Sequence, residues 1–344
     1  MKETTSVQPL SSTGEALAGA FSGGFSRMII APLDVLKIRF QLQVEPVTSR
    51  VVQSLNSPSV KPHYTSVLQA VSSLIKEEGI RTLWRGNFPA MVLWISYMSV
   101  SFPVYRLAHS YISDELNTSK IIVLTDKSTK KTSPAIIPSL FAGAISGSVA
   151  TFVTYPSDWL RTRIASQGVP PQHPTMWALI TNVYKTEGIR GFFRGLFPTM
   201  MQIAPSLAVT FCSYEQSKDV WDTFFIHSHS DSVEIRSSHF RNLICGAIAG
   251  TLGKLSVYPL DTVKKRLQVQ GMKRNESYGA IRVYTGTLHA IRSIFSEEGI
   301  VGLYKGLSPS LLKAGTGAAV TFWSYEFAVS CLLDFQNIRV RKRE

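Results

Sequence analysis

The segment LAGAFSGGFSRMIIAPLDVLKIRF, residues 17–40, decides the fold, because it occurs three times in the chain. Its counterparts are FAGAISGSVATFVTYPSDWLRTRI at 141–164 and ICGAIAGTLGKLSVYPLDTVKKRL at 244–267. Each copy carries a Gly-x-x-x-Gly pair and, at a constant distance, Pro-x-Asp-x-x-Lys/Arg. Glycines one helical turn apart predict close approach of a neighbouring helix. Three long repeats predict three similar modules around one axis.

A second block follows each copy and repeats with fixed internal spacing. It consists of Glu-Gly, four further residues, an aromatic residue, Lys or Arg, and Gly. The three aromatic-base-glycine triplets are Trp84-Arg85-Gly86, Phe193-Arg194-Gly195 and Tyr304-Lys305-Gly306. Together the two blocks divide the chain into modules at 14–112, 136–222 and 240–334.

Composition indicates a membrane protein. Charged residues make up 17% of the chain, against about 25% in soluble globular proteins. Every candidate helix contains glycine, proline or a charge, a pattern typical of helices that line a polar cavity within the bilayer. At about 1.5 Å per residue six segments are long enough to cross a bilayer. These are 14–43, 86–112, 136–166, 195–222, 240–270 and 306–334.

The 344-residue chain has a formal net charge of +13. Basic residues recur at fixed positions of the repeats, which favours anionic lipid or an anionic substrate over nucleic acid. No Ser/His/Asp, Cys/His or metal-ligand constellation stands at a catalytic spacing. We therefore expect neither an enzyme nor a bound metal or cofactor.

The repeated acid and base lie on nearly the same helical face, because they are three residues apart. They can pair within one helix, or in a threefold bundle each acid can reach the base of the neighbouring helix. The second arrangement closes a ring of three pairs: Asp34–Arg161, Asp158–Lys264 and Asp261–Lys37. A charge left unpaired at membrane depth is costly, so we expect the charges of the ring to be paired with one another or hydrated.

Two glutamines stand four residues after the base of their module, Gln41 in the first and Gln268 in the third. A side-chain amide at this position can hydrogen-bond across a closed ion pair and brace it. An equally open interpretation is a polar side chain that faces water. The second module has Ala165 at this position, so we expect two braces at most.

Pro-x-Asp-x-x-Lys/Arg followed by Glu-Gly and aromatic-Lys/Arg-Gly, three times over, resembles the mitochondrial carrier family across essentially the whole chain. The resemblance implies an all-α protein of the inner membrane, with six transmembrane helices in three pseudo-symmetric repeats. It also implies short amphipathic matrix helices, at 65–77, 174–186 and 284–297, and termini in the intermembrane space. The three aromatic-base-glycine triplets are similar to the family's cardiolipin-binding element.

The family's second ionic ring, at the cytoplasmic side, is incomplete in this chain. The second module has Glu215 and Lys218, whereas the other two modules contribute only His109 and Glu326. The family's pairing order leaves Glu326–His109 as the single attraction there, against three attractive pairs on the matrix side. We therefore predict that the empty carrier favours a closed matrix gate.

Three basic residues interrupt the expected helices near mid-membrane: Arg27, Lys254 and Lys313. Snorkelling to headgroups suits residues at helix ends better than these. We expect these three cations to be unpaired and to converge on one cavity, which predicts an anionic, phosphorylated substrate. Trp94 and Gln202 stand at corresponding depths, where they can meet the rings of a substrate, although Trp94 fits packing equally well.

Four segments are similar to the branch of the family that imports thiamine pyrophosphate, namely 34–43, 160–168, 261–269 and 306–314. The resemblance implies a monomer that imports thiamine pyrophosphate by alternating access, in exchange for a matrix nucleotide. Three alternatives stay open on the sequence: a carrier of adenine nucleotides, a carrier of coenzyme A derivatives, and a proton-leak carrier of the same fold.

Overall fold

The computed structural model describes residues 12–43, 64–118, 136–168, 171, 175–225, 234–272 and 283–341. Within these residues the chain forms helices and no strand. The long helices are α1 (Ser12–Leu42), α4 (Asn87–Thr118), α5 (Ile136–Ser166), α7 (Leu196–Phe225), α8 (Glu234–Val269) and α10 (Leu307–Arg341). The short helices are α3 (Val67–Glu78), α6 (Met176–Gly191) and α9 (Thr287–Leu303), with a 3-10 turn η1 (Ile80–Trp84).

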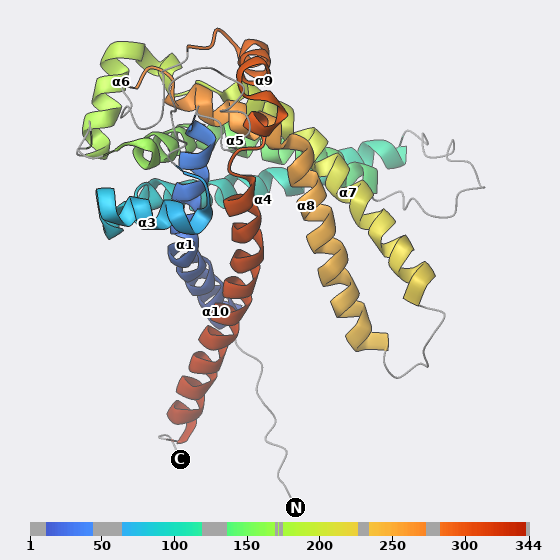
Figure 1. Cartoon of the computed structure of the whole chain (residues 1–344). Coiled ribbons are helices and arrows are strands. Elements are labelled where there is room, and N and C mark those ends of the chain that lie inside the picture. The colour runs from blue at the N-terminus through green and yellow to red at the C-terminus, as the bar shows by residue number, and fades with distance from the viewer. Residues whose placement is uncertain are drawn as a thin grey trace, which may run out of the picture.

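The long helices associate in three pairs, α1 with α10, α4 with α5, and α7 with α8. Each pair joins the last helix of one repeat to the first helix of another, so the repeats interlock around a ring. The pairs meet at one end, beside the short helices, and diverge toward the other end (Figure 1). α1 begins and α10 ends at the diverging side (Figure 1).

The short helices cover the converging end, and each contributes to a buried apolar cluster there. Each packs on the C-terminal part of the long helix that opens its own repeat. In the first repeat Leu36 and Leu74 belong to the same buried cluster, in the second Trp159 and Leu179, and in the third Val263 and Ile294. The buried apolar clusters of the fold therefore lie at the end where α1, α5 and α8 converge.

Three regions are long and apolar enough to cross a membrane by length and composition alone, among the described residues. They are Ile80–Asp114, Leu196–Thr223 and Arg241–Val269. α1 and α5 are of similar length but are not among these three regions.

The expected close approach at every repeated glycine is wrong for part of the set. A Cβ added at Gly19, Gly246 or Gly250 would meet no atom within 4 Å, whereas at Gly23 and Gly147 it would meet a side chain of the neighbouring helix. A missing side chain leaves room for a second helix, but it does not bring one there.

The tightest glycine contact lies outside the Gly-x-x-x-Gly pairs, at Gly253 of α8. A Cβ there would lie 2.0 Å from Thr210 Oγ1 and 3.1 Å from the Ser206 carbonyl oxygen of α7. We expect Gly253→Ala to destabilise the carrier by about 1–3 kcal/mol through overpacking of α7 on α8. Gly246→Ala, on the open side of the same helix, is the matched control and should lose no stability. Equal melting temperatures in detergent for the two variants would contradict the contact.

Candidate functional site

The three ion pairs expected between neighbouring repeats are all present where α1, α5 and α8 converge. Arg161 Nη2 lies 2.5 Å from Asp34 Oδ2, and Lys264 Nζ lies 2.8 Å from Asp158 Oδ2. Lys37 Nζ closes the ring 2.5 Å from Asp261 Oδ2. All six side chains are 10–18% exposed. We call these three contacts the ion-pair ring.

Both glutamines hydrogen-bond across an ion pair of the ring. Gln41 Nε2 donates to Asp261 Oδ2 at 3.2 Å, and Gln268 Nε2 donates to Asp158 Oδ2 at 3.0 Å. Each amide also reaches the phenol of a tyrosine that precedes a repeated proline, Tyr258 or Tyr155. These contacts add donors to two of the three ring carboxylates.

Two further lysines join the ring, and they correct the sequence interpretation. Lys313 was expected to be unpaired in the cavity, but its ammonium donates to Asp34 Oδ1. Lys265, which the sequence interpretation missed, donates to Asp158 Oδ1 at 3.3 Å and to Thr162 Oγ1 at 2.7 Å. A comparison of the repeats distinguishes Lys265, because the corresponding position of the first repeat is occupied by the apolar residue Ile38.

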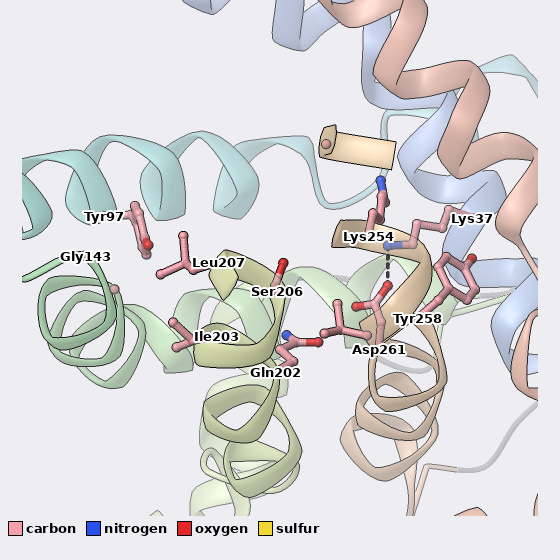
Figure 2. A pocket seen from close by; sticks show the side chains of 13 residues that line it. Lys37, Tyr97, Gly143, Gln202, Ile203, Ser206, Leu207, Lys254, Tyr258 and Asp261 are labelled. Carbon is pink, nitrogen blue, oxygen red and sulfur yellow. Dashed lines mark hydrogen bonds and ion pairs between the residues drawn. The ribbon is translucent and has the colours of Figure 1, made fainter. Parts of the chain in front are cut away.

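A cavity of three adjoining lobes lies between the helix pairs, beside the ion-pair ring. The α1/α10 lobe has a volume of about 360 Å³, the α4/α5 lobe about 350 Å³ and the α7/α8 lobe about 400 Å³. Neighbouring lobes share lining residues. The α1/α10 and α4/α5 lobes share Arg27 and Trp94. The α7/α8 lobe shares Gln202 with the α4/α5 lobe and Lys254 with the α1/α10 lobe. Figure 2 shows the α7/α8 lobe, with Lys254 beside the Lys37–Asp261 pair.

The three cations predicted for the substrate converge on the α1/α10 lobe. Arg27, Lys254 and Lys313 all line it, from three different helices. Nη1 of Arg27 is buried and has no hydrogen-bond partner among the described residues. Within the described part of the chain Lys254 makes one long contact, 3.4 Å, to the Ser310 carbonyl oxygen. This lobe therefore holds donors that are free to bind an anion.

The α4/α5 lobe is aromatic and rich in hydroxyl groups. Trp94 lies against α1 at the border with the α1/α10 lobe, where a Cβ on Gly23 would come within 2.7 Å of its ring. Tyr97, which the sequence interpretation missed, lines this lobe and the α7/α8 lobe together with Gln202. Tyr97 carries no repeat signal, so only the fold reveals it.

The basic residues of the three aromatic-base-glycine triplets each form an ion pair with the glutamate of their own repeat. Lys305 and Arg266 share the carboxylate of Glu298, and the side chains of all three are at most 4% exposed. The second repeat has the same triad, with Arg163 3.1 Å and Arg194 3.0 Å from Glu187. The first repeat contributes Arg39, Glu78 and Arg85.

These triads join each repeat to another one. Arg39 Nε donates to the Ala165 carbonyl oxygen at 2.9 Å, and Arg163 Nε donates to that of Gln268 at 2.9 Å. Arg266 Nε completes the cycle at the Gln41 carbonyl oxygen, 3.1 Å away. Each arginine thus caps the C-terminal carbonyls of another repeat's helix. We call the three triads and these contacts the arginine clasp. The signal was present in the sequence, as an arginine seven residues after every repeated proline.

The residues expected at the cytoplasmic gate, Glu326 and His109 among them, make no ion pair with any described residue. Lys218 lies over the ring of Tyr214, at 4.2 Å from its centroid, and His109 lies beside Tyr105. The helices that carry these residues, α4, α7 and α10, diverge at this end (Figure 1). The structure therefore combines a closed ion-pair ring with an open opposite side.

Three interlocked helix pairs, with a basic cavity beside a ring of ion pairs, define a membrane transporter of threefold architecture. The sequence model of the family described as "Mitochondrial carrier protein" matches residues 8–116, 133–224 and 236–336. The chain belongs to the mitochondrial carrier family, and it is a transporter of a mitochondrial membrane rather than an enzyme.

Curated relatives are similar over nearly the whole chain. Mitochondrial thiamine diphosphate carrier 2 of Zea mays is 40% identical over 322 residues, which cover 91% of this chain and 92% of the relative. Mitochondrial thiamine diphosphate carrier 1 of Arabidopsis thaliana is 37% identical over the same shares. Mitochondrial thiamine pyrophosphate carrier 1 of Neurospora crassa is 37% identical, covering 91% of this chain and 89% of the relative.

Proposed function

We propose that the chain imports thiamine pyrophosphate across the mitochondrial inner membrane, by alternating access and in exchange for a matrix nucleotide. The names of the relatives support the substrate. The observation that carries the proposal is the convergence of Arg27, Lys254 and Lys313 on one lobe. That lobe adjoins an aromatic lobe at Arg27 and Trp94. A substrate with a diphosphate at one end and aromatic rings at the other matches this division.

The two lobes give the substrate an orientation. The diphosphate lies in the α1/α10 lobe, where Arg27 and Lys254 donate to its oxygens. The thiazolium ring carries a positive charge and is repelled by that lobe, so it lies over the face of Trp94 by a cation–π contact. Gln202 and Tyr97 then meet the polar edge of the pyrimidine in the α4/α5 lobe.

The ion-pair ring serves as the matrix gate in this proposal, with the short helices on the matrix side and both termini toward the intermembrane space. Three ring pairs, two glutamine contacts and two extra lysines stabilise closure at this end. Among the described residues the cytoplasmic side has no matching pair at His109, Glu215, Lys218 and Glu326. The empty carrier therefore favours the state open to the intermembrane space.

Cardiolipin contact in this proposal rests on backbone amides at the helix N-termini, because the bases of the three triplets are paired with glutamates. Ser66 and Thr175 cap α3 and α6 with their side chains, by accepting from the amides of Gln69 and Ala178. Gly286 precedes α9 and supplies no side-chain cap. The N-terminus of α9 is thus the one that offers most free donors to a lipid phosphate.

The test is uptake by liposomes that contain the purified full-length chain. Radiolabelled thiamine pyrophosphate should enter vesicles loaded with a nucleotide and should enter empty vesicles much more slowly. Uptake of adenine nucleotide or coenzyme A without uptake of thiamine pyrophosphate would establish a rival cargo. A proton current that a pH-sensitive dye detects, without uptake of any of these compounds, would establish the proton-leak alternative.

Trp94 is expected to recognise the ring end of the substrate only. We expect Trp94→Leu to weaken binding of thiamine pyrophosphate about 5- to 30-fold, since a desolvated cation–π contact is worth up to about 2 kcal/mol. Binding of inorganic pyrophosphate should not change. Trp323→Leu, at an exposed tryptophan of α10, is the matched control. If both ligands lose the same affinity in Trp94→Leu, Trp94 serves packing alone.

A further inference from the structure

Asp34 is shared by two cations that belong to different parts of the carrier. Arg161 Nη2 binds one carboxylate oxygen at 2.5 Å and belongs to the ion-pair ring. Lys313 Nζ binds the other oxygen and extends from α10, where it also lines the α1/α10 lobe. One ammonium group thus touches the ring and the cavity at the same time. We call the Lys313–Asp34 contact the α10 tie.

The α10 tie is a contact that an anion in the lobe can take over. Asp34 keeps Arg161 when Lys313 leaves, so no carboxylate is left unpaired at membrane depth. Lysine is a compact charge on a flexible stem, which can turn from one acceptor to another without moving its helix. A phosphate group carries more charge than a carboxylate, and Arg27 and Lys254 hold it beside Lys313.

We propose that Lys313 passes from Asp34 to the substrate when the α1/α10 lobe fills, so that the Asp34–Arg161 pair senses the occupancy of that lobe through Lys313. The empty carrier has α10 tied to the ring. The occupied carrier has lost that tie, and Asp34 depends on Arg161 alone. The inference rests on the proposed function for its substrate class, an anion with terminal phosphate groups.

Lys265 provides a built-in comparison. It is likewise the second lysine on a ring carboxylate, with Asp158 Oδ1 at 3.3 Å. Its other partners are Thr162 Oγ1 at 2.7 Å and Gln268 Oε1 at 3.0 Å, and it lines none of the three lobes. An anion in the cavity therefore has no access to Lys265, although its pairing resembles that of Lys313.

The experiment is a pair of double-mutant cycles on the full-length carrier in detergent. One cycle combines Asp34→Asn with Lys313→Gln, and the other combines Asp158→Asn with Lys265→Gln. Apparent melting temperatures are measured without ligand and with saturating inorganic pyrophosphate. Without ligand we expect a non-additivity of about 2–5 °C in both cycles. With pyrophosphate, the coupling of Asp34 to Lys313 should fall by half or more, while the Asp158–Lys265 coupling stays constant.

Three outcomes would overturn the proposal: a constant Asp34–Lys313 coupling, an equal fall in both cycles, or no response of the unsubstituted carrier to pyrophosphate. If Asp34→Asn does not fold, Asp34→Glu keeps the charge, moves the carboxylate and completes the cycle. Liposome uptake of thiamine pyrophosphate, measured in parallel, separates the two proposals. Uptake with constant coupling refutes the α10 tie alone, whereas a changed coupling without uptake refutes the substrate alone.

Discussion

Replacing Arg27 by glutamine should lower thiamine pyrophosphate uptake at low concentration about 100-fold. Arg27 carries a buried, unpartnered Nη1 and lines both the α1/α10 and the α4/α5 lobe. A hydrogen bond to a charged group is worth about 1.5 kcal/mol at the low end of its range, so losing two of them costs about 3 kcal/mol, or about 100-fold. Arg27→Lys keeps the charge and loses the bidentate geometry, and should cost about 10-fold.

Stability measurements separate this role from a structural one. Because Arg27 makes no ion pair with any residue that the structure describes, Arg27→Gln should leave the melting temperature of the empty carrier unchanged or raise it. The increase that thiamine pyrophosphate produces in the parent protein should disappear. Arg190→Gln, at an exposed arginine of α6, is the control of equal charge change. Undiminished uptake in Arg27→Gln would remove Arg27 from the substrate site.

Replacing Glu298 by glutamine should destabilise the carrier by about 3–5 kcal/mol, the largest loss of stability that we expect from one substitution. Glu298 is the shared partner of Arg266 and Lys305, and the side chains of these two cations are each 1% exposed. Without its charge, two cations stay buried near backbone carbonyls that cannot neutralise them. The effect should appear as a lower yield of folded protein and a lower melting temperature.

The adjacent acid gives a matched control for this change. Glu297 belongs to the same helix and is exposed, so Glu297→Gln should stay within about 0.5 kcal/mol of the parent protein. Adding Lys305→Met to Glu298→Gln should recover part of the loss, because one of the two stranded charges is removed. Equal stability of the two glutamine variants would show that the arginine clasp does not hold the repeats together.

The parts of the fold that obey the threefold repeat were predictable from the sequence. Asp34, Asp158 and Asp261 recur at one depth of three equivalent helices, so the pairing order follows from geometry. The glutamines Gln41 and Gln268 could be placed for the same reason. The sequence left each base a choice between the acid of its own helix and that of a neighbouring helix, and the contacts show the second arrangement.

The rest depends on contacts that a repeat pattern does not determine. Lys313 breaks the symmetry, and a flexible side chain can bind either a substrate or Asp34 from the same helix position. The sequence shows that Lys305 is charged, but not that its side chain turns into the protein, because that direction depends on where Glu298 lies in space. Gly246 leaves room for a neighbouring helix, yet whether one fills that room depends on how the helix pairs diverge.

The cyclic order of the arginine clasp has a consequence for how the protein is made. The carbonyl of Gln41, at the end of the first long helix, receives its donor from Arg266, more than two hundred residues later in the chain. During synthesis the first repeat is complete long before the group that caps it exists. The ring is therefore finished only when the last repeat enters the membrane. A carrier truncated before that repeat lacks the cap of its first helix and exposes the clasp of its second.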